Sequence, residues 1–363
     1  MSMKIFTKGQ LALTFLTVAC LVGVVTSLIV NSLITNQIIF EAQERVKEDL
    51  NTARYVYASK IRDVDRTVRW TAIRHVLKNG LKEKNISSIR NELEGLMFEE
   101  GLDFLTLVDR NGLVVFRFHN PPVSGDSLLS DPFIRIALEK KEISGTQVLS
   151  GDELSKEGRS LARKAIIAAI PVPKEKPARK MEETSGMVLK AANPILDFNG
   201  NVLGVLTGGV LLNRNFEIVD QIKNIVFKDA KYKGKEIGTA TIFLGDLRIS
   251  TNVMDREGNR AIGTRVSEEV YEHVLGKGFP WIQRAFVVDD WYITAYEPIR
   301  DVQNNIVGML YVGMLESKYA LMKERLILLF FFFSMSGMLI ALTVSFFLSW
   351  KMFKRQIPNH KHQ

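Results

Sequence analysis

The stretch PILDFNGNVLGVL, residues 194–206, decides the fold because it recurs as PIRDVQNNIVGML at residues 298–310. In both stretches a polar, Asn-containing segment separates two runs of apolar and β-branched residues, which is the pattern of two antiparallel strands joined by a tight turn. The match continues at the same offset to Leu211 and Leu315. A unit that recurs at a constant offset indicates a tandem repeat of one supersecondary structure.

A second strand–turn–strand pattern precedes each copy. Residues 103–108 and 113–117 are rich in strand-forming residues and flank the turn Asp109-Arg110-Asn111-Gly112, and residues 245–248 are its counterpart upstream of the second copy. We therefore predict an α+β fold with two tandem five-stranded antiparallel units, each with a helix near its first hairpin. Residues 213–228 are expected to link the units as a helix.

One long helix is predicted before the first unit. Apolar residues recur every three or four positions through residues 36–80, which is the spacing of one helix face. This stripe has two interpretations. It forms a dimer seam like that of an irregular coiled coil, or it packs on the chain's own globular part, and each interpretation can apply to a different level along the helix. The stripe consists of Val46, Leu50, Ala53, Tyr57, Ile61, Val64, Val68, Ala72 and His75.

Two uncharged stretches are long enough to cross a bilayer, which takes about 20 apolar residues. They cover residues 9–40 and 326–350, within which we predict transmembrane helices over 11–34 and 326–350. The first apolar run is too long for a cleaved secretory signal and has no cleavage site, so we expect an uncleaved anchor.

The charges around these stretches predict the topology. The tails, residues 1–10 and 351–363, carry lysine and arginine but no acidic residue. By the positive-inside rule both tails are cytoplasmic, and residues 36–325 lie outside the cytoplasm. The formal net charge of +8 comes mostly from these tails, because residues 41–325 hold 42 basic and 40 acidic side chains. The basic excess therefore does not indicate nucleic-acid binding.

Cofactor and enzyme chemistry find no support in the residue pattern. The single cysteine, Cys20, lies in the first apolar stretch, so no internal disulfide and no cysteine-based metal or haem site is expected. Gly125-Asp126-Ser127-Leu128 spells the tetrapeptide of one esterase family, but no histidine has the Asp three positions earlier that would complete such a site. We expect a protein that is not an enzyme and holds no metal or cofactor.

Six segments of the chain resemble the double Cache sensor regions of bacterial membrane receptors, and most closely the Cache 3/Cache 2 fusion type of sensor histidine kinases. These segments cover residues 183–190, 209–215, 238–243, 248–253, 263–271 and 291–299. The resemblance implies PAS-like Cache modules and an extracytoplasmic sensor of a small organic ligand, such as a carboxylate or an amino acid. It also implies a homodimer in the bacterial inner membrane.

With this resemblance the chain divides into seven expected parts. They are a cytoplasmic tail (1–10), a first span (11–34), a signalling and dimerisation helix (35–82), a membrane-distal Cache module (83–228), a membrane-proximal Cache module (229–320), a second span (326–350) and a cytoplasmic tail (351–363).

The sequence departs from the family after the second span, where such receptors continue into a HAMP helix pair and a kinase or methyl-accepting domain. This sequence stops shortly after Trp350. We therefore expect a sensor without its own transmitter, which serves a separate kinase or chemotaxis transmitter or is a truncated receptor. The alternative is a membrane-anchored interaction protein without a ligand.

Candidate ligand contacts are polar and aromatic residues on the predicted strands of both modules. Arginine clamps a carboxylate with two hydrogen bonds, and tyrosine and tryptophan supply apolar walls with polar tips. The competing interpretation is that the tyrosines are core residues and the arginines are solvated. The proximal candidates are Arg248, Thr251, Asn252, Trp281, Arg284, Tyr292, Thr294 and Tyr296; the distal candidates are Arg117, His119, Arg163 and Lys190.

Overall fold

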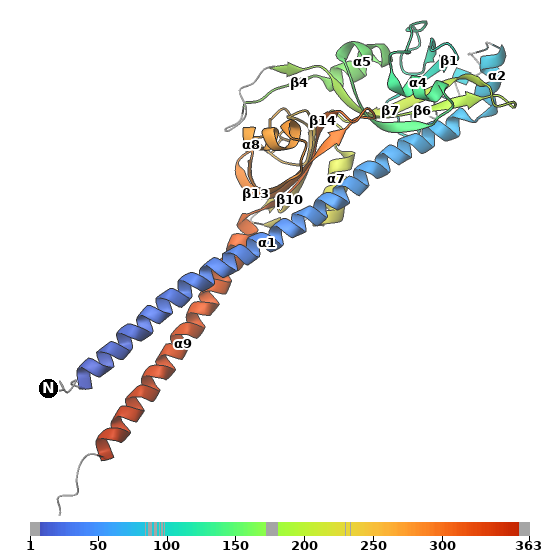
Figure 1. The fold of residues 1–363 in the computed structure, drawn as a ribbon. Helices are drawn as coiled ribbons and strands as arrows, with labels where there is room; N and C mark the ends of the chain where they lie inside the picture. The colour runs from blue at the N-terminus through green and yellow to red at the C-terminus, as the bar shows by residue number, and fades with distance from the viewer. Residues whose placement is uncertain are drawn as a thin grey trace, which may run out of the picture. The chain divides into compact units, whose positions relative to one another are not determined.

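The computed structural model describes residues 8–83, 85, 89, 90, 93, 95, 97, 99–171, 181–228, 230–232 and 234–355 (Figure 1). The outer parts of both predicted cytoplasmic tails lie outside these residues. The chain divides into two compact units, one of Met1–Ala42 with Glu316–Gln363 and one of Gln43–Leu315. The second unit holds all the sheets.

The helix predicted over residues 35–82 proves to be two helices, so that prediction was wrong at its C-terminal end. Thr71 donates its hydroxyl to the Thr67 carbonyl, and the Arg74 N–H bonds the Thr71 carbonyl in a turn instead of extending the helical ladder. The described helices are α1 (Lys8–Ala72), α2 (His75–Glu83), α4 (Pro132–Leu138), α5 (Gly151–Glu157), α6 (Arg159–Ala165), α7 (Glu217–Phe227), α8 (Glu268–Tyr271), the π-helix η1 (Glu272–Gly276) and α9 (Ser317–Arg355).

Two five-stranded antiparallel sheets follow with the same topology. The first has the order β2-β1-β7-β6-β3 and the second β11-β10-β14-β13-β12. The first consists of β1 (Phe104–Asp109), β2 (Val114–Arg117), β3 (Ile143–Leu149), β6 (Gly186–Leu196) and β7 (Val202–Leu211). The second consists of β10 (Gly238–Leu244), β11 (Leu247–Thr251), β12 (Trp281–Val287), β13 (Asp290–Arg300) and β14 (Ile306–Leu315). Two short ribbons accompany them: β4 (Ile167–Ala168) with β5 (Glu182–Glu183), and β8 (Lys231–Tyr232) with β9 (Lys235–Glu236).

The sequence repeat coincides with equivalent hydrogen bonds, which confirms the two predicted strand–turn–strand units. Asp197, after β6, accepts bonds from the backbone N–H groups of residues 199 and 201, and Asp301, after β13, accepts the same bonds from residues 303 and 305. Such aspartate-capped turns satisfy the backbone locally. The glycines of the repeat, Gly204 and Gly308, are required because a Cβ atom at either would collide with a carbonyl oxygen of the neighbouring strand.

The apolar stripe of α1 packs mainly on the chain's own second unit, which agrees with the second of its two interpretations. Val46, Ala53, Val64 and Val68 are almost fully buried, and Val68 lies against Gly208 of β7. His75 does not continue the stripe, because it is exposed and lies in α2. A dimer contact would therefore need another face of the helix.

Within the part of the chain that the structure describes, two helices are long and apolar enough to cross a membrane. The stretches run from Leu21 to Ala72 within α1 and from Ser317 to Val344 within α9. Their large apolar side chains are largely exposed, as Leu28, Phe332 and Leu339 illustrate.

The second sheet is covered on both faces. Helix α7 packs against β10 and β11, and η1 contacts β13 and β14. Figure 1 shows α8 and α7 on opposite sides of this sheet. The core beneath α8 and η1 is built from Phe243, Tyr296, Tyr311 and apolar residues of the covering segment, Val253 to Val274. The candidate functional site lies on this covered face.

Candidate functional site

Six of the eight proximal candidates lie on this one face of the second sheet. Directly paired residues of neighbouring strands share a face, and so do alternate residues along a strand. The pairs that define the face are Arg248 with Phe243, Thr251 with Thr241, Tyr311 with Tyr296, and Tyr296 with Trp281. The six candidates are Arg248, Thr251, Trp281, Tyr292, Thr294 and Tyr296.

The structure separates the other two candidates from this group. Asn252 follows β11, and its side-chain oxygen accepts a 2.7 Å bond from the Ala240 N–H. Arg284 pairs with Ile293 across the sheet, so it belongs to the opposite face, where it is exposed and stacks 3.8 Å from the Trp291 ring centroid. It therefore does not converge with Arg248.

Arg248 is a buried cation without a counter-ion among the described residues. Its exposed fraction is 2%, and its guanidinium lies 5.3 Å from the Phe243 ring centroid. Within the described part of the chain its Nε and Nη1 atoms are buried and have no hydrogen-bond partner. Burial lowers the pKa of Arg248, because desolvation disfavours the charged form. An unpaired buried charge is costly, and an anion or other acceptor beside the guanidinium would lower that cost.

The tyrosines around Arg248 do not supply that negative charge. Burial raises the pKa of Tyr311 to about 12 and raises the pKa values of Tyr292 and Tyr296 as well. All three are therefore neutral at physiological pH. The Tyr311 hydroxyl lies 3.0 Å from Thr239 Oγ1.

Two further donors beside this region have no acceptor. Asn252 Nδ2 and Trp281 Nε1 are buried without a hydrogen-bond partner among the described residues. Buried polar groups are almost always hydrogen-bonded in folded proteins. Since these groups and Arg248 are all donors, the missing partner is an acceptor, such as a carboxylate or water.

A small cavity lies against Arg248. Its volume is about 10 Å³, room for about one water molecule. Its wall includes Tyr296 and residues of two segments outside the central strands, Thr264 to Ser267 and Phe286 to Val288. An organic anion would need a more open form of this cavity.

Tyr311 and Phe243 were missed in the choice of candidates. Tyr311 was accessible from the repeat, because it occupies the position of Thr207 in the matched stretches and alternation then places it on the face of Tyr296. No comparable signal pointed to Phe243, whose role follows from its contact with Arg248.

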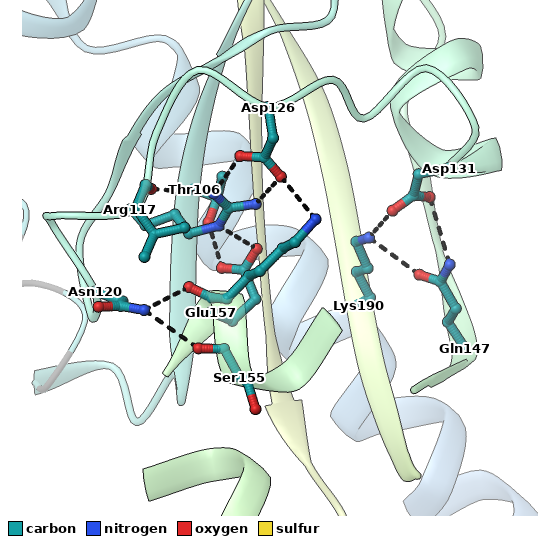
Figure 2. Close-up of polar contacts among 11 residues, drawn as sticks. Thr106, Arg117, Asn120, Asp126, Asp131, Gln147, Ser155, Glu157 and Lys190 are labelled. Carbon is teal, nitrogen blue, oxygen red and sulfur yellow. Dashed lines mark hydrogen bonds and ion pairs between the residues drawn. The ribbon is translucent and has the colours of Figure 1, made fainter. Parts of the chain in front are cut away.

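The first sheet also buries an arginine, but here the chain supplies the anions (Figure 2). Arg117 has an exposed fraction of 1%. It donates to both carboxylate oxygens of Asp126, at 2.6 and 3.0 Å, and to Glu157 Oε1 at 3.0 Å. Thr106 donates to the other oxygen of Glu157 at 2.5 Å. The hydrogen bonds from Arg117 lower the pKa of Asp126.

The remaining distal candidates do not converge with Arg117 on one pocket. Lys190 is buried and binds Asp131 and, at 3.0 Å, Gln147 Oε1, beside Arg117 in Figure 2 but in a separate group. His119 is half-buried, with Nε2 2.8 Å from Ser160 Oγ, and Arg163 is exposed. In the described residues no three His, Cys, Asp or Glu side chains cluster as metal ligands.

One protein-family model matches the part of the chain that holds this candidate site. Residues 210–325 match the family model described as "Single cache domain 3". This segment contains the whole second sheet and Arg248. No curated protein matches the sequence.

Solved structures of sensor domains align with most of this chain, at low sequence identity and with TM-scores below 0.5. The periplasmic domain of Vibrio cholerae LuxQ aligns with 74% of this chain and 99% of its own length, at 11% identity and a TM-score of 0.42. The sensor domain of the V. cholerae histidine kinase DctB aligns with 75% of this chain and 96% of its own length, at 11% identity and a TM-score of 0.41. The ligand-binding domain of the Campylobacter jejuni chemoreceptor Tlp3, in complex with L-valine, aligns with 80% of this chain and 97% of its own length, at 10% identity and a TM-score of 0.40.

Proposed function

We propose that the chain is a membrane-anchored extracytoplasmic sensor that binds a small organic anion, a carboxylate or an amino acid, at Arg248. The observation that carries this proposal is the buried guanidinium without a counter-ion, within the segment that matches the Cache family model. A ligand carboxylate would supply the charge and the acceptors that the second sheet lacks. Charge-assisted hydrogen bonds of this kind are among the strongest in proteins.

The domain organisation belongs to the same proposal. Residues 83–228 form a membrane-distal and residues 229–320 a membrane-proximal Cache module, with spans over 11–34 and 326–350. The equal strand orders of the two sheets and the exposed apolar residues of α1 and α9 support this arrangement. Both termini are cytoplasmic, and residues 36–325 face the outside of a bacterial inner membrane.

The signal leaves the sensor through the last strand. β14 ends at Leu315 and α9 begins at Ser317, so a shift of the sheet face that binds the ligand reaches the second span through a very short connection. Helix shifts of about 1–2 Å are within the usual range of transmembrane and interfacial switching. A separate kinase or chemotaxis transmitter would receive this shift, and the sensor would act as a homodimer.

The test is thermal unfolding of the full chain in lipid nanodiscs against a panel of carboxylates, amino acids, amines and purines. A compound that binds only the folded state raises the melting temperature in a saturable way. We expect one class of anion to do so, Arg248→Met to abolish the shift, and Arg284→Ala, an exposed arginine on the opposite face, to keep it. A flat panel would instead favour an anchored interaction protein without a ligand.

A further inference from the structure

The cavity beside Arg248 is too small for an organic ligand, so one of its walls must move. One wall is Thr264 to Ser267, and another is Phe286 to Val288 at the tip of the β12–β13 hairpin. The volume of about 10 Å³ holds about one water molecule. The two walls differ in how the rest of the chain holds them.

The first wall is fixed by backbone hydrogen bonds on two sides. Arg248 N–H donates to the Thr264 carbonyl at 2.9 Å, and Gly263 N–H donates to the Arg248 carbonyl at 2.9 Å. From the other side, Ile170 N–H donates to the Gly263 carbonyl at 2.8 Å. This wall would move only with β11 and the segment at Ile170.

The second wall ends in a turn: Val287 is buried and pairs with β13, whereas Val288 and Asp289 beyond it are half-buried, and surface side chains hold this tip. β12 is the outermost strand of its sheet, and Val287 pairs with Asp290 across the turn. Lys235 of β9 binds Asp290 and lies 3.9 Å from Asp289. Lys235 keeps 54% of its side chain exposed, whereas Asp290 and Asp289 are 29% and 22% exposed, and ion pairs at the solvent boundary are weak, so this contact can open readily.

The turn itself is strained. Val288 has a φ of 57°, in the left-handed region that β-branched residues rarely adopt. Strain of this kind persists only where surrounding contacts enforce it, and it clusters at ligand clamps and switches. The ion pairs of Lys235, together with the packing of Val288 against the core, thus hold the tip in a backbone conformation that valine disfavours.

We propose that the turn at Val288 and Asp289, the tip of the β12–β13 hairpin, is a lid over the Arg248 site, held shut by the ion pairs of Lys235 with Asp289 and Asp290 and of Arg256 with Asp289. This inference rests on the proposed function, because it takes the Arg248 cavity as the place where the anion enters. Opening the lid exposes the guanidinium, and the apparent affinity for the ligand is set in part by the fraction of open molecules.

The test measures access to Arg248 without any ligand. The full chain in nanodiscs is treated with phenylglyoxal, which modifies accessible guanidinium groups, and the rate at Arg248 is followed by peptide mass mapping. We expect Lys235→Met to raise this rate about two- to fivefold, as the loss of a weak ion pair allows. The matched control is Lys231→Met, which removes a similarly exposed lysine of the same ribbon that pairs with Glu236 instead.

A second variant changes the lid in the opposite direction. Asn tolerates the left-handed region, so Val288→Asn relieves the strain of the closed turn and should slow modification of Arg248 about two- to fivefold. Equal rates in Lys235→Met and Lys231→Met, or a rate in Val288→Asn no lower than in the wild type, would overturn the lid.

The experiment distinguishes a failure of the lid from a failure of the proposed anion sensor. If the variants change the rate as expected but no anion of the panel protects Arg248, the lid stands and the anion sensor fails. If an anion protects Arg248 while Lys235→Met leaves the rate unchanged, the sensor stands and the lid is wrong.

Discussion

Arg117 on β2 and Arg248 on β11 lie on corresponding faces of corresponding edge strands, where they pair with Thr106 of β1 and Phe243 of β10. The two buried arginines differ in whether the chain neutralises their charge. Arg117 is bound by Asp126 and Glu157. Arg248 has no acidic partner among the residues that the structure describes, and aromatic rings surround it. The difference teaches that the first sheet neutralises its buried arginine with carboxylates of the chain, whereas no described carboxylate does so in the second sheet.

The largest effect should come from removing the paired arginine. Arg117→Met leaves the buried Glu157 without its cation and Asp126 with only the exposed Lys156 at 3.5 Å, and we expect the free energy of unfolding to fall by about 3–5 kcal/mol. Thermal or denaturant unfolding of the full chain measures it. Adding Asp126→Asn and Glu157→Gln to Arg117→Met should recover part of the loss. A loss below about 1 kcal/mol would mean that the ion pairs do not stabilise the first sheet.

Removing the unpaired arginine, Arg248, should raise the free energy of unfolding instead of lowering it. Arg248→Met replaces an uncompensated buried charge with an apolar side chain of similar length, so the ligand-free protein should gain about 1–3 kcal/mol. The same unfolding experiment measures this gain. A destabilisation comparable to that of Arg117→Met would show that Arg248 has a counter-ion within the chain, and the comparison between the sheets would break.

The smallest effect is a pH dependence confined to the first sheet. Arg117 lowers the pKa of Asp126 below its ordinary value of 3.8, so the stability that Asp126 contributes is present above that value and is lost as pH falls through the lowered pKa. We expect Asp126→Asn to cost about 1–2 kcal/mol at pH 7, and this difference from the wild type to shrink as the solution is acidified below pH 3.8.

The control for this pH dependence is Arg248→Met, which should keep the acid profile of the wild type, because no carboxylate among the described residues pairs with that arginine. A difference between Asp126→Asn and the wild type that stays constant below pH 3 would contradict the assignment of this pH dependence to Asp126.

Local patterns were enough for the strands and for much of the site. The repeat at residues 194–206 and 298–310 predicted both strand–turn–strand units, and the period-2 alternation of a strand is enough to place Tyr292, Thr294 and Tyr296 on one face. The same period-2 rule, continued across paired strands, brings Arg248 and Trp281 to that face. Periodicity of this kind is a property of neighbouring residues, so the chain order alone carries it.

Tertiary contacts decided everything that depends on partners far along the chain. The sequence shows arginines at positions 117 and 248 but not that Glu157 of α5 reaches the first while no described carboxylate reaches the second. It also shows the apolar stripe of α1 but not which surface covers it. The sequence determined the strands, their repeat and their faces, because local periodicity encodes them. Only the tertiary structure decided which buried charge is neutralised, because that depends on how loops and helices fold back over each sheet.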